Sequence, residues 1–477
     1  MHAAKATTLA FLGQAAFAFG ITFNVPATPP SNASPQLVAA PIGVSLEFFT
    51  FPGYMNDVAA TSTCLRNLGD LFGEMPPVRI GGTTQDRATY DAGLSSAVDY
   101  YVANPADAPA SLTFGPSFMS LAGSYGGKVT LGLNRRLNNQ ANTIAAAQVA
   151  IQRMNNLYAI ELGNEPNFYS GSDPIAGGSW DAGRDRTSQV SWQRAVGNSL
   201  SNKNILQGGV FFGVGDYSVG NLIAAQGDAG QYVNSYCTHN YPQSSNTANL
   251  AALMSHNQIA SQISPWRSEV AAAASVGKPL IMGETNSATQ GGGGISPTFG
   301  AALWVMDYII QAVSLGIESL FFHQGTIGNC QYCWWGRYSM GAPYYGAYFA
   351  AMAIGKADKI APLDDFRTAY GAYAIYENNR PVRVLLYNSD FYTSGNRGQE
   401  TFTLTGLTSS SQVTAKRLTA PNANSRQDRG ENPNIAGRSF TDGTCVMQGT
   451  ETVETVAVSG GQATFTVAAS EALLVYL

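Results

Sequence analysis

Short apolar runs recur through the first three quarters of the chain, and polar turns or helical patterns separate them. Eight runs lack a helical period and many are bounded by Gly, Pro or Asn: Gly43–Phe49, Val78–Gly82, Val129–Asn134, Leu157–Gly163, Ile205–Phe212, Ser235–Asn240, Leu280–Glu284 and Ser319–His323. Such runs are typical of strands buried on both faces of a parallel sheet. Apolar residues at helical spacing lie between several of them, over Asn142–Met154, Thr187–Ser199, Ile259–Ser275 and Phe299–Leu315.

This alternation of strands and helices predicts the α/β class and a (β/α)8 TIM barrel. A doubly wound open sheet is the structural alternative. That fold would be expected to carry a glycine-rich phosphate turn after an early strand, and Gly81-Gly82 does not complete a G-x-G-x-x-G fingerprint. The pattern therefore favours the barrel.

The pattern changes after about residue 361, where apolar and polar residues alternate and no helical stretch intervenes. The predicted strands are Arg367–Tyr376, Val382–Tyr387, Thr401–Leu404, Val413–Leu418, Val453–Val458, Thr464–Val467 and Leu473–Tyr476. They predict a C-terminal antiparallel β-sandwich. Phe19–Val25 also reads as a strand and is expected to cross over to this sandwich, whereas the polar segment Ala420–Gly449 is expected to be an exposed loop.

The first 18 residues have the features of a secretory signal peptide. Lys5 provides a basic start, Leu9–Gly20 is mostly apolar, and Ala16-Phe17-Ala18 fits an A-x-A cleavage site. A buried N-terminal helix is the alternative. We expect a signal peptide over 1–18, an N-terminal strand segment over 19–40, a catalytic barrel over 41–360 and a sandwich over 361–477. The mature protein is then secreted, and Asn32-Ala33-Ser34 is an N-glycosylation sequon.

Composition narrows the classes of partner. The 477 residues carry a net charge of −5, and 45% are apolar. No basic stripe predicts nucleic-acid binding, and no other apolar stretch has a membrane-spanning length. Of five cysteines, Cys330 and Cys333 resemble half of a zinc or redox motif, but no second pair lies near them. A local disulfide is favoured, and we expect neither a metal nor a cofactor.

Two glutamates follow predicted barrel strands, where active groups of such barrels are found. Glu165 follows the fourth run, in Asn164-Glu165-Pro166, and Glu284 ends the seventh. Two carboxyl groups about 5–5.5 Å apart suit a retaining glycosidase. Each glutamate alone has another reading, as a favourable charge near a helix N-terminus. The pair, on two separate strands, favours catalysis.

The chain resembles clan A of the glycoside hydrolases and, within it, glycoside hydrolase family 79, the β-glucuronidase and heparanase family. The resemblance rests on SLEFF (Ser45–Phe49), VRIGGTTQD (Val78–Asp86), ELGNEPNFY (Glu161–Tyr169), GETNSATQGGGG (Gly283–Gly294) and FFHQGTIGNCQYCWWGRYS (Phe321–Ser339). It covers the barrel and extends into the sandwich. It implies Glu165 as acid/base and Glu284 as nucleophile.

The same resemblance implies supporting roles. Asn164 matches the residue that binds the sugar 2-OH, Tyr241 the tyrosine that hydrogen-bonds the nucleophile, and Arg79 the arginine that keeps the nucleophile ionised. A buried ion pair for Arg79 and a core position for Tyr241 are the structural alternatives.

Further residues are predicted to bind substrate. The family uses a glutamate at the position of Glu47. The glycine run beginning at Gly291 can present N–H groups to a carboxylate. His323 and the aromatic loop containing Tyr332 and Tyr338 offer rings and hydroxyl groups to a sugar. A flexible loop and an aromatic cluster shared with the sandwich are the alternatives for the last two segments.

We therefore expect a retaining, exo-acting β-glucuronidase that releases terminal glucuronic or 4-O-methylglucuronic acid from glycans. The alternatives are a clan A β-glycosidase acting on a neutral glycan and a non-catalytic carbohydrate-binding protein on the same scaffold. An endo-acting heparanase would need basic clusters along its cleft, and Arg135-Arg136 is the only adjacent basic pair in the barrel.

Overall fold

Eight parallel strands close into a barrel in the computed structural model, which describes residues 20–408 and 410–477. The strands are β2 (Ile42–Glu47), β3 (Val78–Gly81), β7 (Val129–Leu133), β8 (Leu157–Leu162), β9 (Leu206–Phe212), β10 (Val233–Asn240), β12 (Leu280–Thr285) and β14 (Ser319–Gln324). Their order around the barrel is β10-β12-β14-β2-β3-β7-β8-β9. The predicted barrel is confirmed, and all eight predicted runs coincide with its strands. The predicted signal peptide, 1–18, lies outside the described residues.

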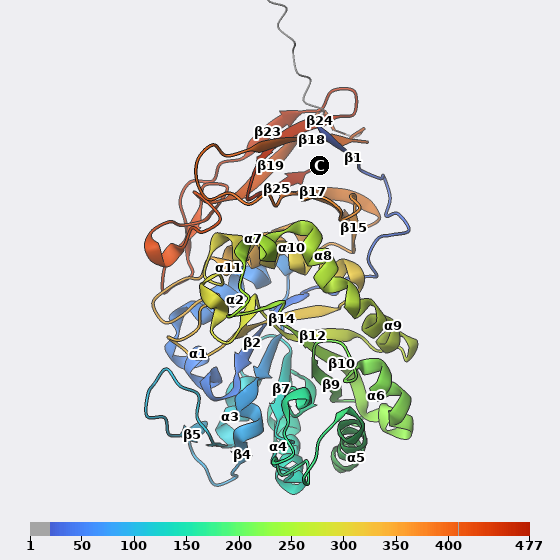
Figure 1. Ribbon diagram of the computed structural model, residues 1–477, viewed down its shortest axis with the longest axis vertical. Helices are drawn as coiled ribbons and strands as arrows, with labels where there is room; N and C mark the ends of the chain where they lie inside the picture. Colours follow the sequence, from blue (N-terminus) through green and yellow to red (C-terminus); the bar gives the residue numbers. More distant parts are fainter. Residues whose placement is uncertain (1–19, 409) are drawn as a thin grey trace, which may run out of the picture.

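Helices surround the barrel (Figure 1). They are α1 (Phe51–Asp57), α2 (Ala59–Phe72), α3 (Pro116–Gly123), α4 (Gln140–Arg153), α5 (Ala182–Ser199), α6 (Val219–Gln226), α7 (Leu250–Met254), α8 (His256–Ile263), α9 (Arg267–Ser275), α10 (Phe299–Leu315) and α11 (Pro343–Ile354). The single helix expected over Ile259–Ser275 is instead split between α8 and α9 by a 3₁₀ turn at Ser264–Trp266. Pro265 explains the break, because proline lacks the N–H that a continuous helix needs.

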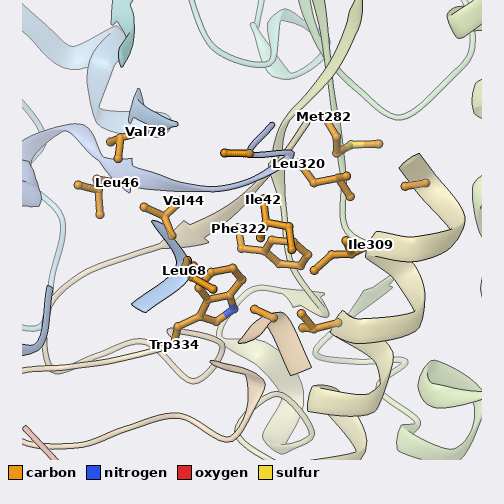
Figure 2. Close-up of a cluster of buried hydrophobic side chains, with 14 of the residues drawn as sticks. Ile42, Val44, Leu46, Leu68, Val78, Met282, Ile309, Leu320, Phe322 and Trp334 are labelled. Atoms are coloured by element: carbon orange, nitrogen blue, oxygen red, sulfur yellow. The ribbon is translucent and has the colours of Figure 1, made fainter. Parts of the chain in front are cut away.

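Side-chain alternation along each barrel strand separates the core from the site. In β2, Ile42, Val44 and Leu46 are fully buried, and Figure 2 shows them in a cluster with side chains of α2, α10 and β14. Because successive side chains of a strand point to opposite faces, Ser45 and Glu47 are left to face the barrel interior and its mouth. Packing on one face thus fixes the polar groups on the other.

A β-sandwich covers one side of the barrel, with α7, α8, α10 and α11 between the two parts (Figure 1). One sheet contains β15 (Lys359–Pro362), β16 (Tyr370–Glu377), β17 (Arg380–Asn388), β25 (Glu471–Tyr476), β19 (Gln412–Thr419), β20 (Asn434–Ile435) and β23 (Glu454–Ala457). The other contains β1 (Ile21–Asn24), β18 (Gln399–Thr405) and β24 (Ala463–Ala468). Strand β1 pairs in parallel with β18, so the described part of the chain contributes to the sandwich before it enters the barrel.

The segment 420–449 differs from the exposed loop expected for it. Ala423, Ile435 and Phe440 are buried, and the Phe440 ring lies 4.8 Å from the ring of Tyr344 in α11. A disulfide joins Cys445 to Cys64 of α2. The expectation was wrong because the few apolar residues of this polar segment are spaced irregularly. Their sequence pattern shows neither strand nor helix periodicity, yet their side chains pack against the barrel helices.

Short additional strands lie in the loops that connect the barrel strands and in the C-terminal segment. β4 (Ala88–Tyr90), β5 (Val98–Tyr100) and β6 (Leu112–Phe114) form a three-stranded sheet between β3 and α3, and β11 (Gln243–Ser244) pairs with β13 (Ala288–Thr289). β21 (Ser439–Phe440) pairs with β22 (Met447–Gln448) in the segment described above. The β11–β13 pair connects the loops that follow β10 and β12, which both carry polar residues of the barrel mouth.

Candidate active site

A pocket of about 600 Å³ opens at the carboxyl ends of the barrel strands. Its lining comes from most of the strand-end loops: Glu47, Thr83, Glu165, Phe168, Phe212, Tyr241, Pro242, Gln243, Ser244, Thr247, Glu284, Thr289, Gln290, His323 and Tyr332. Both glutamates singled out in the sequence are in this lining. A pocket with a few convergent polar groups is the usual form of a small-molecule or sugar site.

Arg79 of β3 lies beneath the pocket, only 1% exposed. Its Nη1 donates to Glu284 Oε2 at 2.6 Å and to Ser45 Oγ at 3.0 Å, and its Nε donates to both carboxylate oxygens of Glu161 at 2.9 and 3.0 Å. Its Nη2 donates to Asn164 Oδ1 at 2.8 Å. A guanidinium presents its donors in a fixed plane, so this one residue sets the relative positions of three strand ends.

Glu284 is held as an ionised carboxylate. Besides Arg79, the Tyr241 hydroxyl donates to Glu284 Oε1 at 2.8 Å, and His323 Nδ1 lies 3.6 Å from Oε2. Burial alone would raise the pKa of this carboxyl, but His323, Arg79 and the Tyr241 hydrogen bond outweigh it and lower the pKa to about 2. At neutral pH Glu284 is therefore a charged nucleophile that needs no base to activate it.

Glu165 is held in the opposite protonation state. Burial and the nearby charge of Glu284 raise its pKa to about 8. Its Oε1 lies 2.9 Å from Nδ1 of His239, whose own pKa burial and Arg79 lower to about 4. A neutral imidazole beside a protonated carboxyl is a suitable environment for a general acid at neutral pH.

The Glu165 backbone is in the left-handed region, with φ 45° and ψ 62°. Its N–H donates to Val210 O at 3.1 Å, and Val210 also has a positive φ. Non-glycine residues in this region persist only where the surroundings hold them. The loop after β8 and the irregular backbone at Val210 in β9 thus hold the Glu165 carboxyl over the barrel mouth.

The two glutamates lie close together. An oxygen of Glu165 and one of Glu284 are within 4.8 Å of each other, with His239 in the same group. A close approach of this kind agrees with the short spacing of retaining glycosidases rather than the wider spacing of inverting ones. The pair can supply one nucleophile and one acid in two successive displacements.

Glu47 and His323 form the wall of the pocket nearest β2 and β14. His323 Nε2 lies 3.2 Å from Glu47 Oε2, and Thr84 donates to Glu47 Oε1 through both its N–H and its hydroxyl. Burial opposes protonation of His323, but Glu284 and Glu47 together raise its pKa. Gly82, with φ 95°, allows this arrangement, because a Cβ there would lie 2.6 Å from Glu47 Oε2.

Asp86 supports the loop that carries Asn164 and Glu165. Its Oδ2 accepts from the Asn164 N–H at 2.8 Å and from the Tyr169 hydroxyl at 2.6 Å, and its Oδ1 accepts from the Arg135 N–H at 3.1 Å. The carboxylate therefore connects the ends of β3, β7 and β8. This places the Asn164 amide beside Arg79 at the bottom of the pocket.

The loops after β12 and β14 contact each other. Gly291 to Gly294 all have positive φ, and the Gly294 N–H donates to Gln331 Oε1 at 2.9 Å. Tyr332 follows Gln331, lines the pocket, and lies between Cys330 and Cys333 in sequence. These two cysteines form the local disulfide predicted for them. Cys237 is the free cysteine among the described residues.

The predicted site residues occupy four different environments. Glu47, Tyr241, His323 and Tyr332 line the pocket with the two glutamates, whereas Asn164 and Arg79 lie beneath it. Gly291 lies beside the pocket-lining Gln290. Tyr338 is 82% exposed and lines a separate groove on the same face with Phe49 and Tyr100. The structure thus corrects the grouping of Tyr338 with Tyr332, because the loop folds back at Trp335 and Met340, which form an isolated antiparallel bridge.

Three residues of the site were not predicted from the sequence: His239, Asp86 and Ser45. His239 had a detectable signal: it lies in the predicted strand Ser235–Asn240, two positions before Tyr241, and residues two apart share one face of a strand. Asp86 and Ser45 act on other protein groups, and nothing local in the sequence shows which groups they meet.

One buried cluster has the residue types of a metal site. Ligand atoms of Glu161, Cys237 and His239 lie within 4.8 Å of one another. Both oxygens of Glu161 already accept from Arg79, so a cation bound there would lie next to a guanidinium. The donor set fits an internal hydrogen-bonded core better than a metal centre.

The pKa values of the pair predict a pH profile. On a substrate with a poor leaving group, such as methyl β-glucuronide, kcat/KM should fall above pH 8 as Glu165 loses the proton that it must donate. It should decline at the acid end only as pH approaches about 2, where Glu284 becomes protonated. Initial rates measured from pH 3 to 10 should therefore show no acid limb and an alkaline limb with its midpoint near pH 8. If kcat/KM instead falls with rising pH around a midpoint of pH 4–5, Glu165 has an ordinary carboxyl pKa.

Comparison with known proteins adds independent evidence. The glycosyl hydrolase family 79 C-terminal beta domain matches residues 372–474. A β-glucuronidase of Neurospora crassa is 28% identical over 434 residues, covering 80% of this chain and 76% of that protein. A β-glucuronidase of Aspergillus niger is 30% identical over 407 residues, covering 77% and 74% respectively. Similarity therefore spans both the barrel and the sandwich.

Solved structures agree with this picture. A 4-O-α-L-rhamnosyl-β-D-glucuronidase from Fusarium oxysporum 12S, crystallised as a Rha-GlcA complex, is 65% identical with a TM-score of 0.95, covering 96% of this chain and 100% of that one. A bifunctional glucanase–xylanase from a metagenome library has a TM-score of 0.61 at 12% identity, covering 96% and 98%. The second likeness concerns the fold alone.

Proposed function

The chain belongs to glycoside hydrolase family 79, and from this premise we propose that it is an exo-acting, retaining β-glucuronidase. The observation that carries the proposal is the carboxyl pair within 4.8 Å, one with a pKa of about 8 and the other of about 2. Glu284 attacks the anomeric carbon while Glu165 protonates the leaving oxygen. Glu165 then removes a proton from the water that hydrolyses the glycosyl-enzyme.

The surrounding residues orient the sugar for this reaction. Asn164, held by Arg79 at 2.8 Å, is placed to meet the 2-OH beside the nucleophile. Glu47 offers a carboxylate to the ring hydroxyls on the β2 side of the pocket. Tyr332 and the backbone near Gln290 and Gly291 bind the uronate carboxylate, because a carboxylate gains charge-assisted hydrogen bonds from several donors.

The substrate proposal has a finer level. The solved relative at 65% identity is a 4-O-rhamnosyl-glucuronidase, and this supports a glucuronate that carries a rhamnosyl group at O4 as a substrate of this chain. The product would then be the Rha-GlcA disaccharide rather than free glucuronate. A matched pair of p-nitrophenyl glycosides, with and without the rhamnosyl group, would measure this preference.

The substrate's charge is tested with aryl glycosides. Losing one charge-assisted contact lowers affinity by roughly 10- to 100-fold, so p-nitrophenyl β-glucuronide should exceed the matching glucoside in kcat/KM by at least that factor. The galactoside and xyloside complete the panel. A glucoside hydrolysed as fast as the glucuronide would contradict the uronate assignment and favour the alternative of a neutral β-glycosidase. It would leave the two-glutamate mechanism intact.

Secretion and N-glycosylation remain part of the proposal. The disulfides Cys64–Cys445 and Cys330–Cys333 support an oxidising compartment, and Asn32 of the sequon is exposed. None of the described helices is both long and apolar enough to cross a bilayer. N-terminal sequencing and glycosidase treatment of protein from a culture medium would test both points.

A further inference from the structure

A row of aromatic rings extends outward from the nucleophile. Tyr241, which donates to Glu284, has its ring stacked on that of Phe212, with centroids 6.4 Å apart and planes 17° apart. Phe212 in turn lies 5.2 Å from the ring of Phe168. Phe168 is 61% exposed, and both phenylalanines line the pocket with the two glutamates. An apolar pair left open at the rim of a polar pocket is a binding feature rather than part of the core.

The protein holds this pair rigidly. The Asn167 side chain donates to Phe212 O at 3.1 Å and accepts from the Phe212 N–H at 2.9 Å, which connects the loops after β8 and β9. The indole N–H of Trp180 donates to Pro166 O at 2.8 Å. The exposed ring therefore belongs to a preformed surface, and ligand binding need not order it.

The position of the acid tells which part of the substrate this surface meets. Glu165 must face the glycosidic oxygen, so the leaving group extends toward the β8 and β9 loops that carry Glu165, Phe168 and Phe212. Glu47 and His323 lie on β2 and β14, which are opposite β8 and β9 in the barrel order. The glucuronate occupies that opposite side. The aromatic pair is thus placed for the aglycone.

We propose that Phe168 and Phe212 form a stacking platform for the first pyranose of the aglycone. This inference rests on the proposed function and narrows its substrate class to glucuronate linked to a glycan, as opposed to glucuronides of small alcohols. A pyranose presents a face of C–H groups that packs on an aromatic ring, while its hydroxyls stay in water. Galactose, whose C–H groups gather on one face, is the simplest probe.

Two substrates separate the platform from the chemistry. β-Glucuronosyl fluoride has a leaving group too small to touch Phe168, whereas a β-glucuronosyl-galactose disaccharide places a ring on it. Phe168→Ala should lower kcat/KM on the disaccharide by about 10-fold, as loss of part of a buried apolar contact predicts. It should leave kcat/KM on the fluoride within twofold, and Phe168→Tyr should restore the disaccharide rate.

Transfer to an added sugar gives a second readout. With the fluoride as donor, a galactoside bound on the platform should intercept the glycosyl-enzyme, and Phe168→Ala should lower the ratio of transfer to hydrolysis. Phe391→Ala, which removes an exposed phenylalanine of the sandwich domain, is the matched control and should change neither measurement.

The outcomes are distinct. An unchanged disaccharide rate in Phe168→Ala would overturn the platform. An equal loss on the fluoride would also overturn it, because Phe168 would then act by positioning Glu165. If the wild-type protein hydrolyses neither of these glucuronides nor the 4-O-rhamnosylated p-nitrophenyl glucuronide, the proposed function fails instead, whatever Phe168 does.

Discussion

Replacing Glu284 by glutamine is expected to reduce turnover by about 10⁴-fold or more on every glucuronide, as removal of a covalent nucleophile does in other hydrolases. The amide has the same shape but cannot attack the anomeric carbon. It also ends the ion pair with Arg79, now at 2.6 Å. Arg79 keeps its bidentate pairing with Glu161, so the barrel should stay folded.

The measurement combines rates with thermal unfolding. Glu318→Gln is the matched control, because Glu318 precedes β14 at the opposite end of the barrel and lines a different cavity; its activity should stay within about twofold. A folded Glu284→Gln variant with near wild-type rates would refute the nucleophile assignment. Loss of the folded state would direct the test to kcat of the milder Tyr241→Phe variant, which keeps the carboxylate and removes one donor.

Replacing Glu165 by alanine is expected to have an effect that depends on the leaving group. General acid catalysis contributes about 10²- to 10⁴-fold, and methyl β-glucuronide needs all of it, whereas a dinitrophenyl glucuronide leaves without a proton. On the activated substrate, glycosylation should therefore stay fast while hydrolysis of the intermediate slows, because the water has lost its base. The covalent intermediate should accumulate and be visible as added mass.

Azide and pH identify the missing group. Azide, which needs no base, should restore turnover of the activated substrate in Glu165→Ala and give the β-glucuronosyl azide. The alkaline limb near pH 8 in the kcat/KM profile of methyl β-glucuronide should vanish in this variant, because the group that titrates there is gone. Equal losses on both substrates, without azide rescue, would show that Glu165 is not the acid/base.

Buried strands were the most predictable part of this fold. All eight barrel strands coincide with mostly apolar runs, because parallel strands covered on both faces carry polar residues only at a few inward positions near the site. Helix α10, which is buried between barrel and sandwich, matched its predicted bounds, Phe299–Leu315. The Ile259–Ser275 helix failed at Pro265, where the apolar spacing continued although the backbone hydrogen bonding did not.

The two glutamates were also predictable, because the end of a barrel strand fixes where a side chain lies. The loops were not. Tyr332 and Tyr338 are six residues apart in one aromatic segment, yet one lines the pocket and the other a separate groove. Irregular backbone has no repeating geometry, so the sequence does not indicate where the side chains of a loop point. His239 lies on a strand, but its hydrogen-bond partner is Glu165. This contact is between residues far apart in the sequence, so no neighbouring residue predicts it.

The pairing of β1 with β18 determines the order in which the protein can be completed on the ribosome. Residues 21–24 emerge before the barrel, but their partner, 402–405, is synthesised only after the whole barrel. The barrel strands are therefore all synthesised before the β1–β18 pair can form. For the same reason a fusion partner attached at residue 20 would project from the sandwich, remote in sequence and in fold from the loops that surround Glu165 and Glu284, whereas deleting residues 20–25 would leave β18 as an unpaired edge prone to self-association.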